Sequence, residues 1–74
     1  MIISKREMML GQWIVEEDYY PEVHTTETTI IKGDLKCDQF IADNYIVIEG
    51  SLKASKISCK HGIYVKGSLT INNI

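Results

Sequence analysis

Apolar side chains recur at fixed intervals along the second part of the sequence. From Thr29 onward the spacing between apolar positions is two, four, two, three, two and four, and this pattern then repeats with a period of 17. The positions in the pattern are Thr29, Ile31, Leu35, Cys37, Phe40, Ala42, Ile46, Ile48, Leu52, Ala54, Ile57, Cys59, Ile63, Val65, Leu69, Ile71 and Ile74. All of them except Thr29 are apolar. A fixed period of this length is typical of repeat proteins whose units stack on one another.

The spacing within one repeat predicts its shape. Two residues separated by two positions on an extended strand have their side chains on the same face. A gap of three or four positions resets this alternation, as a corner does. Three such pairs in each repeat predict a three-sided coil, so residues 29–74 should stack into a short triangular β-helix, or β-solenoid, of about 17 residues per coil. Stacked strands lie about 4.8 Å apart, so Leu35, Leu52 and Leu69 should form one inward ladder.

A glycine stands at the same position of every repeat. Gly33, Gly50 and Gly67 occur within the phrase Ile/Val-x-Gly-Ser/Asp-Leu. We place them at one corner of the coil, where a positive φ or a close approach between coils favours glycine. The residues just before them are Lys, Glu and Lys in turn. This alternation of charge favours the predicted register over a slipped one.

The glycine phrase at a period of 17, together with small residues such as Ala54, resembles the bactofilins, a family of bacterial β-helix proteins that form polymers. The resemblance covers about residues 29–74. It implies a scaffold that assembles end to end without a nucleotide. Members of that family carry more coils than this segment provides, and the smaller number of coils is the main departure from their pattern.

Residues 1–28 fit the repeat less well. When the register is continued backwards, Ile14, Asp18, Tyr20 and Val23 fall at inward positions. Asp18 occupies a leucine position, so this part of the chain should form a degenerate coil at best. We therefore divide the chain into an N-terminal acidic and aromatic arm and cap, residues 1–28, and the β-helix repeats, residues 29–74.

The arm should cover one end of the solenoid, because an open end exposes strand edges and core side chains. Within Met1 to Leu10, the spacing from Ser4 to Glu7 is that of a capping box, which favours a short helix. An edge strand fits the same stretch equally well. Trp13 and two neighbouring tyrosines, Tyr19 and Tyr20, supply apolar area for the cap.

Several residues are candidates for contact with another protein. Glu16, Glu17 and Asp18 precede the two tyrosines, and this mixture suits a protein-binding patch, a mimic of nucleic-acid phosphates, or simply a solvated acidic loop. A second candidate is an outward apolar ladder, which either the arm or a second subunit could cover. The full set is Trp13, Glu16, Glu17, Asp18, Tyr19, Tyr20, Ile30, Val47, Tyr64 and Ile74, with Tyr45 beside the ladder.

Composition narrows the function classes. The chain has 74 residues, near the lower limit for burying a sufficient core alone. No apolar run has the length needed to span a bilayer, and no signal-peptide pattern is visible, so we expect a cytoplasmic protein. The net charge of −2 divides into −4 for residues 1–28 and +2 for residues 29–74. The two cysteines are too few for a disulfide-stapled secreted fold.

The residues that could carry chemistry do not form a recognised set. Cys37, Cys59, His24 and His61 lack the spacing of a zinc site, and the cysteines should be buried as small hydrophobes. Hexapeptide-repeat acyltransferases also use triangular coils and need a catalytic histidine, but His61 alone is weak support for that activity. The lysines are not interleaved with aromatic residues, which argues against nucleic acid, and the short N-terminal apolar segment argues against a membrane. We expect no cofactor, no metal and no enzyme activity.

Two functions remain from different classes. The first is a non-enzymatic, self-associating β-helix that serves as a structural or scaffolding module and forms a homo-oligomer. The core is small, and the pattern is interrupted at Ile74 in the middle of a coil, which leaves strand edges for a second chain. The second is a small inhibitor or adaptor that binds one protein target through its acidic, tyrosine-containing surface, for example a phage or mobile-element protein that acts on a host defence complex.

Overall fold

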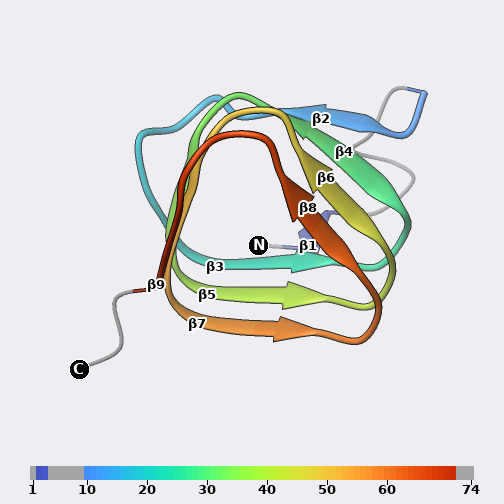
Figure 1. Ribbon diagram of the computed structural model, residues 1–74. Helices are drawn as coiled ribbons and strands as arrows, with labels where there is room; N and C mark the ends of the chain where they lie inside the picture. The colour runs from blue at the N-terminus through green and yellow to red at the C-terminus, as the bar shows by residue number, and fades with distance from the viewer. Residues whose placement is uncertain (1, 4–9, 72–74) are drawn as a thin grey trace.

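The chain winds into a tube of parallel strands around a common axis (Figure 1). The computed structural model describes residues 2–3 and 10–71, and these residues contain strands and no helix. The strands are β1 (Ile2–Ile3), β2 (Gln12–Ile14), β3 (Tyr20–Thr25), β4 (Thr29–Lys32), β5 (Leu35–Ala42), β6 (Ile46–Ile48), β7 (Leu52–Cys59), β8 (Ile63–Val65) and β9 (Leu69–Ile71). The structure is thus an all-β solenoid of about four turns with roughly 17 residues per coil, which confirms the predicted fold class.

The strands form two parallel sheets that together make three walls. One sheet has the order β1-β3-β5-β7-β9 and the other has the order β2-β4-β6-β8. In β5, burial alternates as far as Cys37, is interrupted by the exposed Asp38 and Gln39, and resumes at Phe40. This break in the alternation is a corner within a continuous strand. The long strands β3, β5 and β7 therefore each cover two sides of the coil, and the sheet of β2, β4, β6 and β8 covers the third.

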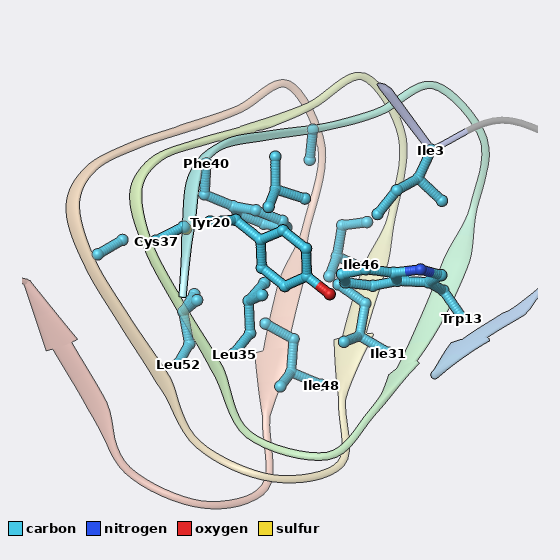
Figure 2. Close-up of a cluster of buried hydrophobic side chains, with 13 residues drawn as sticks. Ile3, Trp13, Tyr20, Ile31, Leu35, Cys37, Phe40, Ile46, Ile48 and Leu52 are labelled. Carbon is cyan, nitrogen blue, oxygen red and sulfur yellow. The ribbon is translucent and has the colours of Figure 1, made fainter. Parts of the chain in front are cut away.

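The register follows the predicted offset. Leu35 pairs with Leu52, and Leu52 pairs with Leu69, which confirms the central ladder. From β4 onward, the ladders of the other two walls have the same offset. Inside the tube the apolar side chains point toward one another (Figure 2). Phe40, Ile31 and Ile48 are fully buried, so stacking converts small repeats into one continuous core.

The glycine corner is shaped by close approach between coils more than by backbone handedness. Gly33 has a φ of 106°, whereas Gly50 and Gly67 do not have positive φ. A Cβ added to Gly50 would lie 2.6 Å from the carbonyl oxygen of Gly33, and one added to Gly67 would lie 2.8 Å from that of Gly50. Both distances are shorter than van der Waals contact, so the stack leaves no room for a side chain.

The residue after each glycine joins one coil to the next. The Asp34 carboxylate accepts a hydrogen bond from the backbone N–H of Ser51 at 2.8 Å. The Ser51 hydroxyl oxygen in turn accepts one from the backbone N–H of Ser68 at 3.0 Å. Short polar side chains are needed here because they satisfy a corner N–H that no strand partner reaches. This explains why the phrase continues with Asp or Ser.

The N-terminal region forms a further coil, with one correction to the predicted register. Tyr20 pairs with Cys37 at the usual offset, whereas Trp13 pairs with Ile31, which is one position further along the chain than that offset gives. The loop between β2 and β3 is therefore one residue longer than its counterparts. As a result Trp13 is buried in place of Ile14, which is exposed.

The longer loop also corrects the prediction for Asp18. This residue is exposed and does not occupy the leucine position of the ladder, whereas Tyr20 and Val23 are buried as predicted. β1 is an edge strand beside β3, one of the two structures expected for the N-terminal stretch. The capping-box spacing at residues 4–7, which favoured a short helix within residues 1–10, lies outside the described residues.

Candidate protein-interaction surfaces

The C-terminal end of the tube exposes residues of the core ladders. β8 and β9 are the outermost strands of their sheets among the described residues. Leu69 is 49% exposed and Ile71 is 53% exposed, whereas Leu52 and Ala54, one coil earlier in the same ladders, are each 1% exposed. Four further ladder residues there are only partly buried: Ile57, Cys59, Ile63 and Val65. We call this apolar surface the end face, defined by these six residues.

Leu69 and Ile71 are not among the interaction residues selected from the sequence. The selection included Ile74 at this end, and that residue lies outside the described part of the chain. Leu69 and Ile71 do follow the apolar pattern of the sequence, because they are the last described rungs of two inward ladders. The same apolar pattern describes both a buried and an exposed rung, so burial could be assigned only after the stacking order was known.

The acidic loop, Glu16–Asp18, lies at the other end of the tube and is held by a buried tyrosine. The Tyr20 hydroxyl oxygen accepts hydrogen bonds from the backbone N–H groups of Glu16 at 3.3 Å and Glu17 at 3.0 Å. The Tyr20 ring packs against Trp13, with 5.4 Å between ring centroids. The backbone of the loop is therefore fixed while its three carboxylates are exposed.

Burial separates the aromatic candidates from one another. Trp13 and Tyr20 lie inside the tube (Figure 2) and act as the cap, so neither presents its ring at a surface. Tyr19 is exposed, and its hydroxyl donates a hydrogen bond to the Asp38 carboxylate. This hydrogen bond raises the pKa of Tyr19 above its ordinary value. Of these three residues, only Tyr19 is available to a partner.

A groove runs between the acidic loop and the glycine corner. Its lining includes Asp18, Asp34, Lys36 and Lys53. Lys36 and Lys53 occupy adjacent rungs of one outward ladder. Like charges in adjacent rungs are unfavourable, and nearby carboxylates reduce this repulsion. The acidic loop thus already faces lysines within its own chain.

The outward apolar ladder is present but only partly exposed. Ile30, Val47 and Tyr64 occupy successive rungs, as predicted, and Gln12 precedes them. Ile30 and Val47 are half-buried, whereas Tyr64 is exposed. The exposed Tyr45 ring stacks on His61 at a centroid distance of 5.0 Å. The apolar area that remains accessible here is mainly that of the two tyrosines.

Outside the tube, charged residues pair between neighbouring coils. Lys32 Nζ lies 2.8 Å from Glu49 Oε1, and this hydrogen bond lowers the pKa of Glu49. His24 Nε2 lies 3.0 Å from Asp43 Oδ2, and Lys60 Nζ lies 3.9 Å from the other oxygen of the same carboxylate. Exposed pairs of this kind stabilise a fold by less than about 1 kcal/mol each. Their main effect is to favour the observed register between neighbouring coils over a slipped one.

The residues considered for chemistry are not brought together. Cys37 is buried inside the tube, and burial raises the pKa of its thiol to about 11, so the thiolate is disfavoured at neutral pH. Cys59 lies one coil further along a different ladder. Over residues 2–3 and 10–71, no group of three or more His, Cys, Asp or Glu side chains is placed to hold a metal ion.

Comparisons with protein families, with curated proteins and with solved structures give no match to this chain. In the part of the chain that the structure describes, no helix has the length and apolar character required to cross a membrane.

Proposed function

We propose that this protein is a non-enzymatic, self-associating β-helix that serves as a structural or scaffolding module. The observation that carries the proposal is the end face, where Leu69 and Ile71 leave about half of their surface in water. Inside the tube the same ladders are closed by the next coil. A second copy stacked on the end face would close them in the same way.

The energetics favour such closure in a chain of this size. Full burial of a leucine or isoleucine contributes about 1.5–3 kcal/mol relative to exposure. A domain of 74 residues has few such contributions in reserve. The outer edges of β8 and β9 also present N–H and C=O groups that a neighbouring strand can satisfy. Association would therefore complete both the core and the sheets.

The likeness of the glycine phrase to the bactofilins supports the same role, and we propose a bactofilin-like assembly on that basis. The hydrogen-bonded corner through Asp34 and Ser51 gives the phrase a physical function, because it fixes the stacking of one coil on the next. We place the module in the cytoplasm, since Cys37 and Cys59 are both free thiols.

We predict that the mass of the protein measured by light scattering exceeds that of a monomer at concentrations of about 10 μM to 1 mM. Dissociation constants in this range correspond to association free energies of roughly 4–7 kcal/mol. Ile71→Lys should remain monomeric, because it places a charge on the apolar end face. Thr70→Lys adds the same charge on the outward side of the same strand, and it should associate like the wild type. A wild-type protein that is monomeric throughout this range would overturn the proposal.

A second candidate function is that of a small inhibitor or adaptor of one protein target. The observation that favours it is the acidic loop, whose backbone is held by the Tyr20 hydroxyl while its carboxylates are exposed beside Tyr19. A loop that is already ordered loses little conformational entropy on binding. Such a surface suits a target with a basic groove.

This candidate predicts that Glu16→Gln, Glu17→Gln and Asp18→Asn together abolish capture of the target in a pull-down and leave the unfolding temperature unchanged. The matched control is Glu22→Gln with Glu27→Gln, which removes acidic charge outside the loop. Recovery of the same proteins by the loop variant and by the wild type would rule the inhibitor function out.

A further inference from the structure

Charge differs between the two ends of the tube. The turn formed by residues 10–28 contains five carboxylates and no lysine or arginine. The last 22 described residues, 50–71, contain four lysines and no carboxylate. The turns between them carry both signs. The molecule therefore has an acidic N-terminal end and a basic C-terminal end, although its net charge is only −2.

Some ladders show the same direction, whereas the ladder of Lys32, Glu49 and Lys66 alternates in sign. Glu22, Gln39 and Lys56 occupy successive rungs of one outward ladder, from acidic through neutral to basic. Asp43 and Lys60 face each other one coil apart, again with the lysine nearer the C-terminal end. The gradient is thus present on more than one wall of the tube.

The strands at the two ends are also compatible. β2 and β8 lie at opposite edges of one parallel sheet, and β1 and β9 lie at opposite edges of the other. A second copy placed in the same orientation would present β2 to the outer edge of β8 and would continue the parallel sheet. Ser68 occupies the position of Asp34 and Ser51 in the outermost corner. By the same pattern, its hydroxyl oxygen would accept an N–H from that second copy.

From these observations we infer that the end face of one copy binds the acidic N-terminal turn of a second copy, so that molecules stack head to tail. This inference rests on the proposed self-association and adds its polarity. The acidic loop of the second copy would lie over the glycine corner, near Lys53 and Lys66. The groove within a single chain already places this loop beside Lys36 and Lys53.

The opposite arrangement, with two end faces together, brings the lysine-rich C-terminal ends of the two copies against one another. Like charges across an interface oppose association. A two-fold contact of that kind would also close after two molecules. Head-to-tail contacts are heterologous, and they continue to add molecules unless the rotation closes a ring.

Two double variants test the polarity. Glu17→Lys with Asp18→Lys reverses charge on the acidic loop, and Lys53→Glu with Lys56→Glu reverses charge at the end face. All four side chains are exposed, and among the described residues the ladder neighbours of the two lysines carry no carboxylate. Lys53 shares a groove with Asp18 and Asp34, but surface charge pairs contribute less than about 1 kcal/mol each, so the fold should be retained. Unfolding temperatures close to that of the wild type check this point.

Each variant alone should self-associate at least about tenfold more weakly than the wild type in sedimentation equilibrium, because attraction across the contact is removed or reversed. An equimolar mixture should regain self-association close to that of the wild type. The intact acidic loop of one variant then meets the intact end face of the other. The two reversed ends, lysine against glutamate, are complementary as well, so the mixture should continue to add molecules.

Other outcomes separate failure of the polarity from failure of self-association. If the loop variant alone associates like the wild type, the end face does not bind the acidic turn, although self-association stands. If both variants are weakened and their mixture does not recover, the two charged regions do not face each other and the inference is wrong. A wild-type protein that does not associate contradicts the proposed function itself.

Discussion

Leu52→Ala will lower the free energy of unfolding by about 2–5 kcal/mol, the usual cost of truncating a buried leucine. Leu69→Ala will lower it by less than about 1 kcal/mol when measured on the monomer. The two leucines are neighbours in one ladder, but Leu52 is 1% exposed and Leu69 is 49% exposed. Only the first deletion leaves a cavity enclosed by a coil on each side.

Urea denaturation at low protein concentration, followed by circular dichroism, measures both free energies of unfolding. In a domain of this size, 1 kcal/mol corresponds to a shift of about 4–8 °C in Tm. Leu52→Ala should therefore melt well below the wild type or fail to fold, while Leu69→Ala should melt within a few degrees of it. Equal destabilisation by the two substitutions would show that the outermost rung is enclosed in the monomer.

Gly50→Ala will destabilise the fold by at least about 2 kcal/mol, at the upper end of what overpacking costs. The added methyl group would collide with the Asp34 carboxylate and with the backbone of Gly33, whose carbonyl oxygen would lie 2.6 Å away. Neither can move freely, because the same carboxylate binds the backbone N–H of Ser51. Relief of the collision would separate the coils at this corner.

Gly62→Ala is the matched control for this prediction. A Cβ at Gly62 would lie 3.3 Å from the Tyr45 ring, an exposed side chain that can rotate away. We expect a loss below about 1 kcal/mol for this variant, as for most surface substitutions. Thermal unfolding of the two alanine variants measures the difference. If both melt at the same temperature, close approach between coils does not explain the regular spacing of the corner glycines along this chain.

The register of the repeats could be predicted from the sequence because many positions specify it together. Inward apolar residues, corner glycines and outward charges all return with the same period. A slip of one residue would turn the leucines of the central ladder outward. The structure confirms that Leu35, Leu52 and Leu69 are stacked.

The first coil could not be placed correctly because its loop has one additional residue. Trp13 and Ile14 are adjacent and both apolar, so the pattern does not distinguish which of them points inward. The loop that precedes Tyr20 determines which of the two residues points inward. The Tyr20 hydroxyl oxygen accepts hydrogen bonds from two backbone N–H groups of that loop. Hydrogen bonds of this kind leave no periodic signal in a sequence.

The interaction surfaces were only partly predictable for a similar reason. The acidic loop is visible as a run of charges, and the structure places it at the surface. The apolar pattern marks Leu69 as a rung of the ladder but does not show that this rung is exposed, because Leu69 has the same sequence context as the buried Leu52. The charge gradient from Glu22 through Gln39 to Lys56 also becomes apparent only when equivalent positions of successive repeats are known to be neighbours.

Sedimentation velocity of the wild-type protein over a concentration series at low ionic strength is the most direct test of head-to-tail stacking through the end face. Stacking of this kind predicts a weight-average mass that rises continuously with concentration and falls when salt screens the two charged ends. A mass that stays at the monomer, or that reaches a plateau at the dimer, would contradict it.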